Sequence, residues 1–237
     1  MKVEPTSVVA KNVEGFSLIE LLVVLTLIMI LSGVSFFYFS SYQRLYSPDN
    51  QSLQVADVLQ EARQRSLTQR ETIRVEIDTT ANVVRLIDEN SQNIPATTND
   101  DVIIRQVPLL PNAEVRVNTR PDNIAYNPPE ELPAPSAQYR QSTYRFSPNN
   151  QVCTMRFLSD GRVFDAGNNN LGDGGVPRGV TLHVWSPKRT NPNEFEVARA
   201  LTVIGSTGSI RLWEFNPSSE EANKWQDSRR TSGFGGR

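Results

Sequence analysis

The sequence is poor in the side chains that most enzyme and metal sites need. Only one of its 237 residues is cysteine and only one is histidine, so neither an internal disulfide nor a zinc-spaced Cys and His set is available. The sequence also lacks a Gly-x-Ser-x-Gly elbow, a phosphate-binding loop and a His-Glu-x-x-His helix. We therefore predict that the protein is not an enzyme and that it uses no cofactor.

We interpret the two rare residues as structural. Cys153 is expected to be a small buried hydrophobe in a strand. His183 alternates with Leu182 and Val184, which predicts a strand in which the histidine faces the opposite side. The tryptophans are scattered along the chain, which favours core and edge positions over a platform for stacking bases: Trp185, Trp213 and Trp225.

The chain also lacks a net charge of the size that attracts nucleic acid or an anionic membrane. Its 24 Lys and Arg residues are balanced by 26 Asp and Glu residues, for a formal charge of -2 at pH 7. A local group of arginines is present at Arg63, Arg65 and Arg70. We interpret this group as the solvated face of a helix rather than as a phosphate or partner site.

A long apolar run dominates the first forty residues. Residues 18–39 contain one charged side chain, Glu20, and as a helix they would extend over about 33 Å. That length is enough to cross a bilayer. The polar leader before the run carries Lys2 and Lys11, which favour keeping it in the cytoplasm and moving residues 40 onward across the membrane.

Three ordinary explanations of this run compete: a secretory signal peptide, a plain membrane anchor and a buried core helix. The run is longer than a secretory signal needs, although Gly33 and Ser35 would form a weak cleavage site. A plain anchor explains the length but gives no reason for Glu20, because a carboxylate at mid-bilayer depth costs about 2.5 to 3.5 kcal/mol. Something is therefore expected to compensate the charge.

The segment Gly15-Phe16-Ser17-Leu18-Ile19-Glu20, followed by an unbroken apolar helix, resembles the processing site of type IV pilins and pseudopilins. The resemblance implies that a prepilin peptidase cuts between Gly15 and Phe16 and that the new terminus becomes N-methyl-Phe16. It also implies that Glu20 meets the positive terminus of a neighbouring subunit during docking into a filament. Opposite charges attract strongly in a medium of low dielectric, so such a pair would select the register.

The same resemblance implies where the protein acts and with what. Residues 1–15 would be a leader peptide and residues 16–39 a transmembrane and filament-core helix. The protein would cross the inner membrane once, with its globular domain on the periplasmic side. Its partners would be prepilin peptidase, other pilins or pseudopilins, and an inner-membrane assembly platform.

Residues 40–70 are predicted to continue as an amphipathic helix. Ser47 and Pro48 have the character of a helix cap and first position, so a kink or a short break is expected near Pro48. An apolar stripe at helical spacing follows and should pack on a sheet: Leu53, Val55, Ala56, Val58, Leu59 and Ala62.

From residue 71 the apolar period changes to two, which predicts a β-rich globular domain over 71–216 and an α+β fold overall. The expected architecture is an antiparallel sheet or a β-sandwich. A hairpin is expected first, at 73–77 and 83–87. Further strands are expected at 102–107, 114–118, 141–147, 151–158, 179–185, 195–204 and 209–215. Five prolines make 121–137 an extended loop, and 217–237 is a polar tail expected to be partly disordered.

Two segments within the mature chain, LQEARQRSLTQRETIRVEID and GSTGSIRLW, resemble the GspH/FimT family of minor pseudopilins and minor pilins. This implies a minor subunit of a type II secretion or type IV pilus filament. Some FimT-like members bind DNA through a Gly-Arg-x-Arg motif, and Gly208-Ser209-Ile210-Arg211 keeps only part of it, as does Gly161-Arg162-Val163-Phe164. A role in DNA uptake, with Arg211 assisted by Arg229 and Arg230, is therefore the less favoured alternative.

Two further alternatives stay open. The glycine-rich loop 165–175 offers oxygen ligands suited to calcium, but their spacing is not that of an EF-hand, and we interpret the loop as a plain surface turn. The candidate ligands are Asp165, Asn168, Asn170 and Asp173. The protein would also be explained as a membrane-anchored β domain that never joins a filament.

Overall fold

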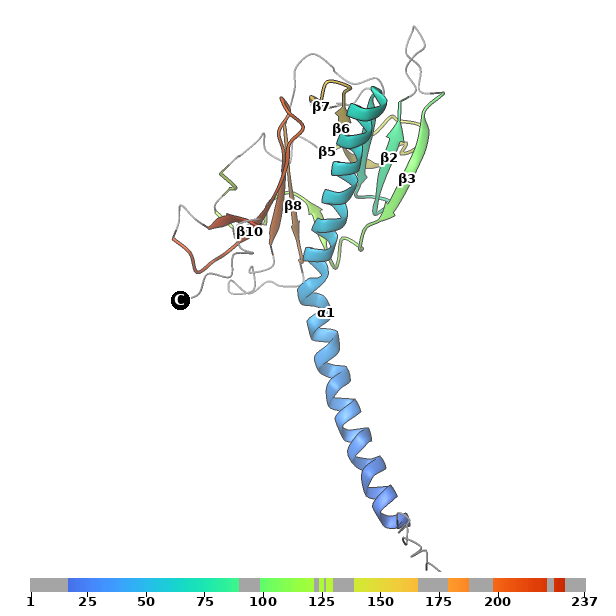
Figure 1. Ribbon diagram of the computed structural model, residues 1–237, viewed down its shortest axis with the longest axis vertical. Helices are drawn as coiled ribbons and strands as arrows, with labels where there is room; N and C mark the ends of the chain where they lie inside the picture. The colour runs from blue at the N-terminus through green and yellow to red at the C-terminus, as the bar shows by residue number, and fades with distance from the viewer. Residues whose placement is uncertain are drawn as a thin grey trace, which may run out of the picture. The chain divides into compact units, whose positions relative to one another are not determined.

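The computed structural model describes residues 17–89, 99–121, 124–125, 127–129, 139–165, 179–187, 198–220 and 224–228, without the side chains of 37–45 and 165 (Figure 1). The chain divides into two compact units, Met1–Gln43 and Arg44–Arg237. The first unit contains the apolar half of the only helix among these residues. The second unit contains the rest of that helix and all of the strands.

The helix, α1, runs from Leu18 to Gln69 without interruption, so the short break expected near Pro48 does not occur. A proline inside a helix removes one backbone hydrogen bond and disturbs the preceding turn. Contacts just beyond Pro48 offset that loss. Asp49 forms an ion pair with Arg199 at 2.5 Å, and the Gln51 side chain accepts a hydrogen bond from the Leu110 N–H at 2.8 Å.

The strands form two antiparallel sheets, which confirms the predicted α+β class. The first sheet has the order β3-β2-β1-β6-β5, and β7 also pairs with β6. Its strands are β1 (Ile73–Asp78), β2 (Val83–Asp88), β3 (Val102–Pro108), β5 (Tyr139–Gln141), β6 (Gln151–Phe157) and β7 (Val163–Asp165).

The second sheet has the order β11-β10-β9-β8-β4. Its strands are β4 (Arg116–Asn118), β8 (Val180–Trp185), β9 (Arg199–Val203), β10 (Ile210–Phe215) and β11 (Trp225–Asp227). A backbone hydrogen bond also connects the two sheets directly: the Val163 N–H of β7 donates to the Gly205 carbonyl in the β9–β10 turn at 2.7 Å.

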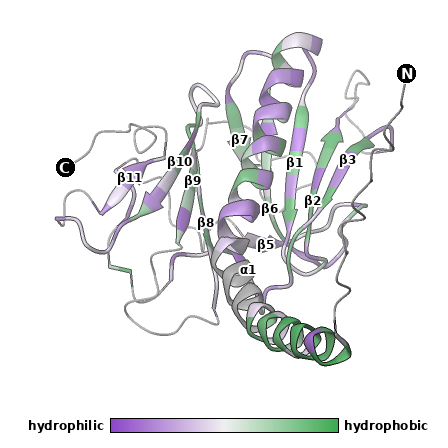
Figure 2. Ribbon diagram, turned by 60° about the horizontal axis from the view of Figure 1, so that its bottom comes forward, coloured by the Kyte–Doolittle hydropathy of each residue, from purple (hydrophilic) through white to green (hydrophobic). Residues whose placement is uncertain are grey.

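The second half of α1 and both sheets share one hydrophobic core. Val55, Leu59 and Ala62 of the helix pack with Val75 of the first sheet and Leu182 of the second. The apolar stripe predicted for residues 53–62 therefore does pack on a sheet, except that Leu53 lies outside the buried stripe and is 57% exposed. In Figure 2 the second half of the helix lies in front of the first sheet, next to β1.

A close approach between two hairpin turns requires a glycine at Gly208. Its φ of 62° lies in the left-handed region, and a Cβ built there would come within 2.5 Å of the Gly161 carbonyl oxygen. Any larger residue would push the β9–β10 turn away from the β6–β7 turn. The partial motifs at 161–164 and 208–211 therefore meet through their glycines.

Several of the predicted strand limits are wrong. The strand expected at 141–147 lies instead at Tyr139–Gln141, and residues 142–150 form turns. The polar tail holds a strand that was not expected, Trp225–Asp227, which pairs with β10 and so extends the sheet past residue 216. The short strand β7 was also missed. Much of the proline loop 121–137, and all of 166–175, lies outside the described residues.

Candidate processing and assembly site

The first turn of α1 is built around Ser17 and Glu20. The Glu20 N–H donates to the Ser17 Oγ at 3.2 Å, and the Leu21 N–H donates to the Ser17 carbonyl at 3.2 Å. Ser17 is thus the N-cap of the helix, and Glu20 is its third residue. The Ser-x-x-Glu spacing is the capping-box pattern, a signal for the helix start that sequence reasoning did not use.

Gly15 and Phe16 lie outside the described residues, so cleavage and methylation at this peptide bond stay predictions. Glu20 lies on an exposed turn at the start of α1. Its carboxylate is placed where the helix dipole favours negative charge. Among the described residues, no cationic side chain contacts this carboxylate. The cost of moving its charge into an apolar environment is therefore not offset by the described part of the chain.

The segment Leu18–Phe36 is long and apolar enough to cross a membrane. Its mean hydropathy is 2.5, and none of it is buried against the described part of the chain. Leu25 and Ile28, for example, are 48% and 52% exposed. An apolar surface of this extent is typical of a segment covered by lipid or by other protein chains.

The hydroxyl of the one threonine within this apolar segment is hydrogen-bonded to the backbone of the same helix. The Thr26 Oγ1 donates to the Val23 carbonyl at 2.8 Å and lies 3.1 Å from the Leu22 carbonyl. A hydroxyl bonded back to its own helix avoids the penalty of an unsatisfied polar group in hydrocarbon. Thr26 is therefore compatible with a membrane or helix-bundle environment.

The second half of α1 is fixed to both sheets by charged contacts. Arg199 of β9 reaches Asp49 on the helix and also Glu214 of β10, at 2.9 Å. Arg105 of β3 donates to Asp57 and Glu61 at 3.0 and 2.6 Å. The arginines predicted to form a solvated helix face are only partly free in solvent. Arg65 pairs with Glu61 at 2.9 Å, and Arg63 donates to the Thr207 carbonyl.

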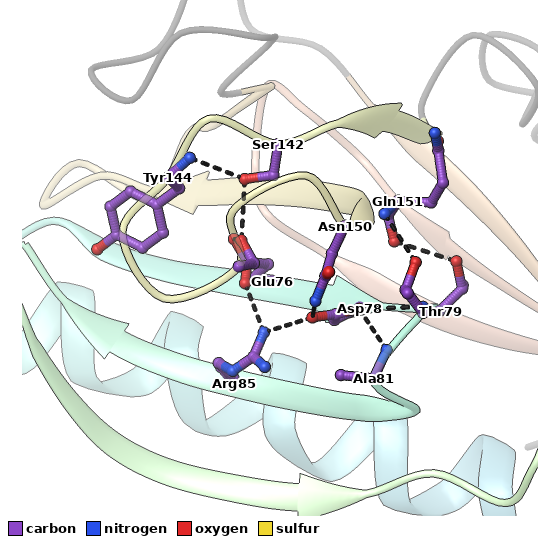
Figure 3. Close-up of polar contacts among 11 residues, drawn as sticks. Glu76, Asp78, Thr79, Ala81, Arg85, Ser142, Tyr144, Asn150 and Gln151 are labelled. Atoms are coloured by element: carbon purple, nitrogen blue, oxygen red, sulfur yellow. Dashed lines mark hydrogen bonds and ion pairs between the residues drawn. The ribbon is translucent and has the colours of Figure 1, made fainter.

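The face of β1 that points away from α1 carries a buried polar network (Figure 3). Arg85 lies across the ladder from Glu76, and its Nη1 is 2.8 Å from the carboxylates of both Glu76 and Asp78. The two carboxylates have no exposed surface, and Arg85 is 8% exposed. One guanidinium therefore neutralises part of the charge of two buried acids.

The turns at 142–150 cover this network and supply its remaining donors. The Tyr144 N–H donates to Ser142, whose hydroxyl lies 2.9 Å from Ser147, and Ser147 donates to Glu76 at 2.8 Å. Asn150 donates to Asp78 at 2.7 Å. This use of the serine and asparagine side chains explains why the segment forms turns rather than the predicted strand.

The two carboxyl groups respond oppositely to this environment. Burial raises the pKa of the Glu76 carboxyl, although Ser147 and Arg85 stabilise its anion. Burial would also raise the pKa of Asp78, but hydrogen bonds from the Ala81 N–H and from Asn150 lower it below its usual value. Every carboxylate oxygen in this pair has a donor, and the site is closed to solvent, so we interpret the network as structural.

A second group of buried charges lies on the same face of the first sheet. Glu89 binds Arg74 at 2.5 Å and Arg156 at 2.5 Å, and Arg74 stacks over the Tyr144 ring at 4.2 Å. The Tyr144 hydroxyl donates to Asp101, and burial together with this bond raises the tyrosine pKa. The network continues from the strands into the turn that covers them.

His183 lies on the outer face of the second sheet, as predicted, and is 2% exposed. Burial lowers its pKa to about 4, with a smaller contribution from Arg120. Its ring contacts Trp225 edge-on at 5.7 Å, and neither ring nitrogen has a hydrogen-bond partner. Trp213 and Trp225 are buried in an apolar cluster on this face, which confirms their interpretation as core residues.

Of the residues proposed for DNA binding, the structure describes Arg211 alone. Arg211 lies in β10 opposite Thr202, on the sheet face that carries His183, and is engaged in a further contact. Arg162 of the other partial motif pairs with Asp160 at 2.6 Å. Arg229 and Arg230 lie outside the described residues.

Most of the candidate calcium ligands lie outside the residues that the structure describes. Asp165 ends β7, whereas Asn168, Asn170 and Asp173 are not described. Among the described residues no group of three or more His, Cys, Asp or Glu side chains is arranged to hold a metal ion. Cys153 is buried in β6, as predicted.

Comparison with known proteins agrees with the N-terminal geometry. Residues 10–36 match the family model for the prokaryotic N-terminal methylation motif, so the chain carries the prepilin-type motif at the start of its apolar helix. A crystal structure of the type IV minor pilin FimU from Pseudomonas aeruginosa is similar at 12% identity. The likeness covers 79% of this chain and 98% of that chain, with a TM-score of 0.39. No curated protein sequence matches the chain.

Proposed function

We propose that this protein is a minor pilin or pseudopilin, a structural subunit of a type IV pilus or type II secretion filament. One observation carries the proposal: the methylation motif at 10–36 includes the apolar segment Leu18–Phe36, which no described part of the chain covers. A motif that directs cleavage of a leader and methylation of a new amino terminus implies a chain destined for assembly through that terminus.

The proposed sequence of events begins in the inner membrane. The chain inserts through Leu18–Phe36 with its globular domain on the periplasmic side, and prepilin peptidase cuts between Gly15 and Phe16. An inner-membrane assembly platform then passes the mature subunit into a filament of other pilins. The β domain acts by contact with those subunits and not by catalysis.

Glu20 is the residue proposed to check the register of docking. Its carboxylate is exposed at the first turn of α1, three residues into the apolar segment, and it lacks a cationic partner among the contacts found for the described residues. The methylated amino group of a neighbouring chain would supply that cation. Pairing of two charges in a medium of low dielectric makes the correct axial position much more stable than a shifted one.

The alternative, an anchored β domain outside any filament, gives Glu20 no role. A substitution of Glu20 distinguishes this alternative from the filament hypothesis. Glu20→Ala is expected to leave the globular domain folded and membrane-anchored, while its amount in a sheared filament fraction falls. Glu20→Asp, which keeps the charge, is the matched control and should retain more incorporation. Wild-type incorporation of Glu20→Ala would contradict the docking role.

A further inference from the structure

The strand β11 closes one end of the second sheet and is held by little backbone. It comes last in the sheet order, has three residues and pairs with β10 alone among the described strands (Figure 2). One backbone bond continues the ladder at each end. The Asn216 N–H donates to the Lys224 carbonyl at 2.7 Å. At the other end, the Ser228 N–H donates to the Leu212 carbonyl at 3.1 Å. Segments with so few backbone bonds open locally more easily than the centre of a sheet, so the position of β11 depends on the side chain that it buries.

Trp225 is that side chain. Its ring is buried in the apolar cluster on the outer face of the sheet and lies 5.2 Å from the Phe215 ring, centroid to centroid. The same ring contacts His183 edge-on, although β10 and β9 separate β11 from β8 in the sheet order. Ala200, which lies opposite His183 on β9, belongs to the same cluster, and its small side chain leaves room for this contact. Trp225 thus connects β11 to the imidazole across the face of the sheet.

His183 occupies a place that suits a neutral ring. The side chain is buried, and neither ring nitrogen has a hydrogen-bond partner. A protonated imidazole carries a positive charge and two N–H donors, and burying these without partners costs far more than burying the neutral ring. Burial accordingly lowers the pKa of His183 to about 4.

The charged groups around His183 would mostly repel a second positive charge. In the described part of the chain, four charged residues lie on this face or at its rim: Arg116 and Arg120 at β4 and just after it, Arg211 on β10 and Asp227 on β11. The residues that β8, β9 and Ile124 contribute to the face are uncharged. Arg120 adds to the effect of burial on the pKa of His183. The ladder places the one acid, Asp227, opposite Trp213, so β10 and β9 separate it from His183.

We propose that β11 is an acid-releasable strap: when His183 takes up a proton, Trp225 leaves the imidazole and β11 detaches from β10. The proton comes from solvent, and no covalent bond within the chain changes. Detachment allows water to solvate the imidazolium and exposes Trp213 and Phe215 on the outer face. The core shared by α1 and the two sheets contains neither His183 nor Trp225, so it is retained. The inference is independent of the proposed filament function.

Hydrogen exchange of the full-length chain in detergent, followed by mass spectrometry at pH 7 and pH 5, measures the release. The protection factor, which corrects for the intrinsic effect of pH on exchange, is compared between a peptide that covers β11 and one that covers β6. A histidine with a pKa of 6.5 in the open state and about 4 in the closed state should lower the protection of β11 about twentyfold between these pH values. At both pH values β11 should be less protected than β6, because it opens without the rest of the unit.

Two substitutions separate the effect of the proton from that of the anchoring side chain. His183→Leu cannot be protonated, so the protection of β11 should stay constant from pH 7 to pH 5. Trp225→Ala removes the anchor and should lower the protection of β11 by at least about tenfold at pH 7 while β6 stays protected. Equal protection of β11 and β6 in the wild type would show that the strand opens only with the whole unit and would overturn the proposal. A wild-type response that persists in His183→Leu, or no response in the wild type, would overturn it as well.

Discussion

The two halves of α1 have similar helical backbone but opposite surroundings. Leu59, in the second half, has no exposed surface and packs between the two sheets. Leu25, in the first half, is 48% exposed, as are comparable apolar side chains throughout Leu18–Phe36. One half is therefore covered by its own chain. The other half has an apolar surface that the described part of the chain does not cover.

The apolar side chains in the two halves of α1 therefore stabilise different processes. Burial of the second half contributes to the folding stability of the globular unit, since its apolar side chains leave water when the domain folds. The described part of the chain does not bury the first half. Under the proposed function, its burial in a membrane or against other subunits would contribute to insertion and assembly. Substitutions should separate these two effects, beginning with the largest.

The largest loss of stability is expected within the globular unit, at Arg85. Arg85→Met leaves Glu76 and Asp78 buried without their shared cation, so the free energy of unfolding should fall by about 3 to 5 kcal/mol. Denaturant unfolding of the full chain in detergent, followed by tryptophan fluorescence, measures it. Membrane insertion should not change. A loss below about 1 kcal/mol would show that the network adds little.

A paired substitution compares the halves of α1 directly. Leu59→Ala removes fully buried methyl groups and should lower the free energy of unfolding by about 2 to 5 kcal/mol. Leu25→Ala makes the same change on the exposed half and should alter it by less than about 0.5 kcal/mol. The same fluorescence experiment serves both variants. Equal effects would mean that the halves do not differ in the way the structure shows.

The pH dependence of the free energy of unfolding tests the burial of His183 in the globular unit. His183 has a folded pKa of about 4, lowered from 6.5 by burial, so the unfolded chain binds a proton first as the pH falls. Its contribution is favourable above pH 6.5 and is lost as the pH falls from 6.5 to about 4, by about 3 kcal/mol at most. His183→Leu should remove this slope.

Unfolding curves of wild type and His183→Leu, measured at several pH values between 7 and 4, give the difference. The comparison isolates His183, because Glu76 and Asp78 titrate in both proteins. Identical pH slopes would mean that the imidazole is solvated or hydrogen-bonded in the folded protein. The result would then conflict with its burial against Trp225.

Much of the fold was predictable because strong local patterns agree with the final packing. The apolar stripe of residues 55–62 and the alternating Ile73, Val75 and Ile77 place their side chains in the core, as expected. The β1–β2 hairpin and the strands β6, β8 and β10 follow from the same period-two pattern. In each of these elements the apolar periodicity extends over enough residues to indicate the secondary structure.

The parts that were missed depend on distant partners. Glu76 and Arg74 alternate with apolar residues, which predicts a solvent-facing side, yet both are buried beneath the turns at 142–150. Nothing in the sequence near β1 indicates that a segment some seventy positions later supplies Ser147 to Glu76. The strand β11 was missed for the same reason, since only pairing with β10 makes residues 225–227 a strand.

The N-terminal methylation motif was the easiest feature to predict because it is local. Ser17, Glu20 and the apolar run are contiguous, and no distant contact decides their chemistry. The order of the strands in the two sheets could not be predicted, because the position of a strand in a sheet is not written in its own residues.

The most direct test of the central claim is the intact mass and amino-terminal sequence of the protein, purified from membranes of a cell that contains prepilin peptidase. A chain that begins at N-methyl-Phe16 is the predicted result, and it would show that the exposed half of α1 is prepared for assembly. An intact leader, or cleavage near Ser35, would contradict the filament account.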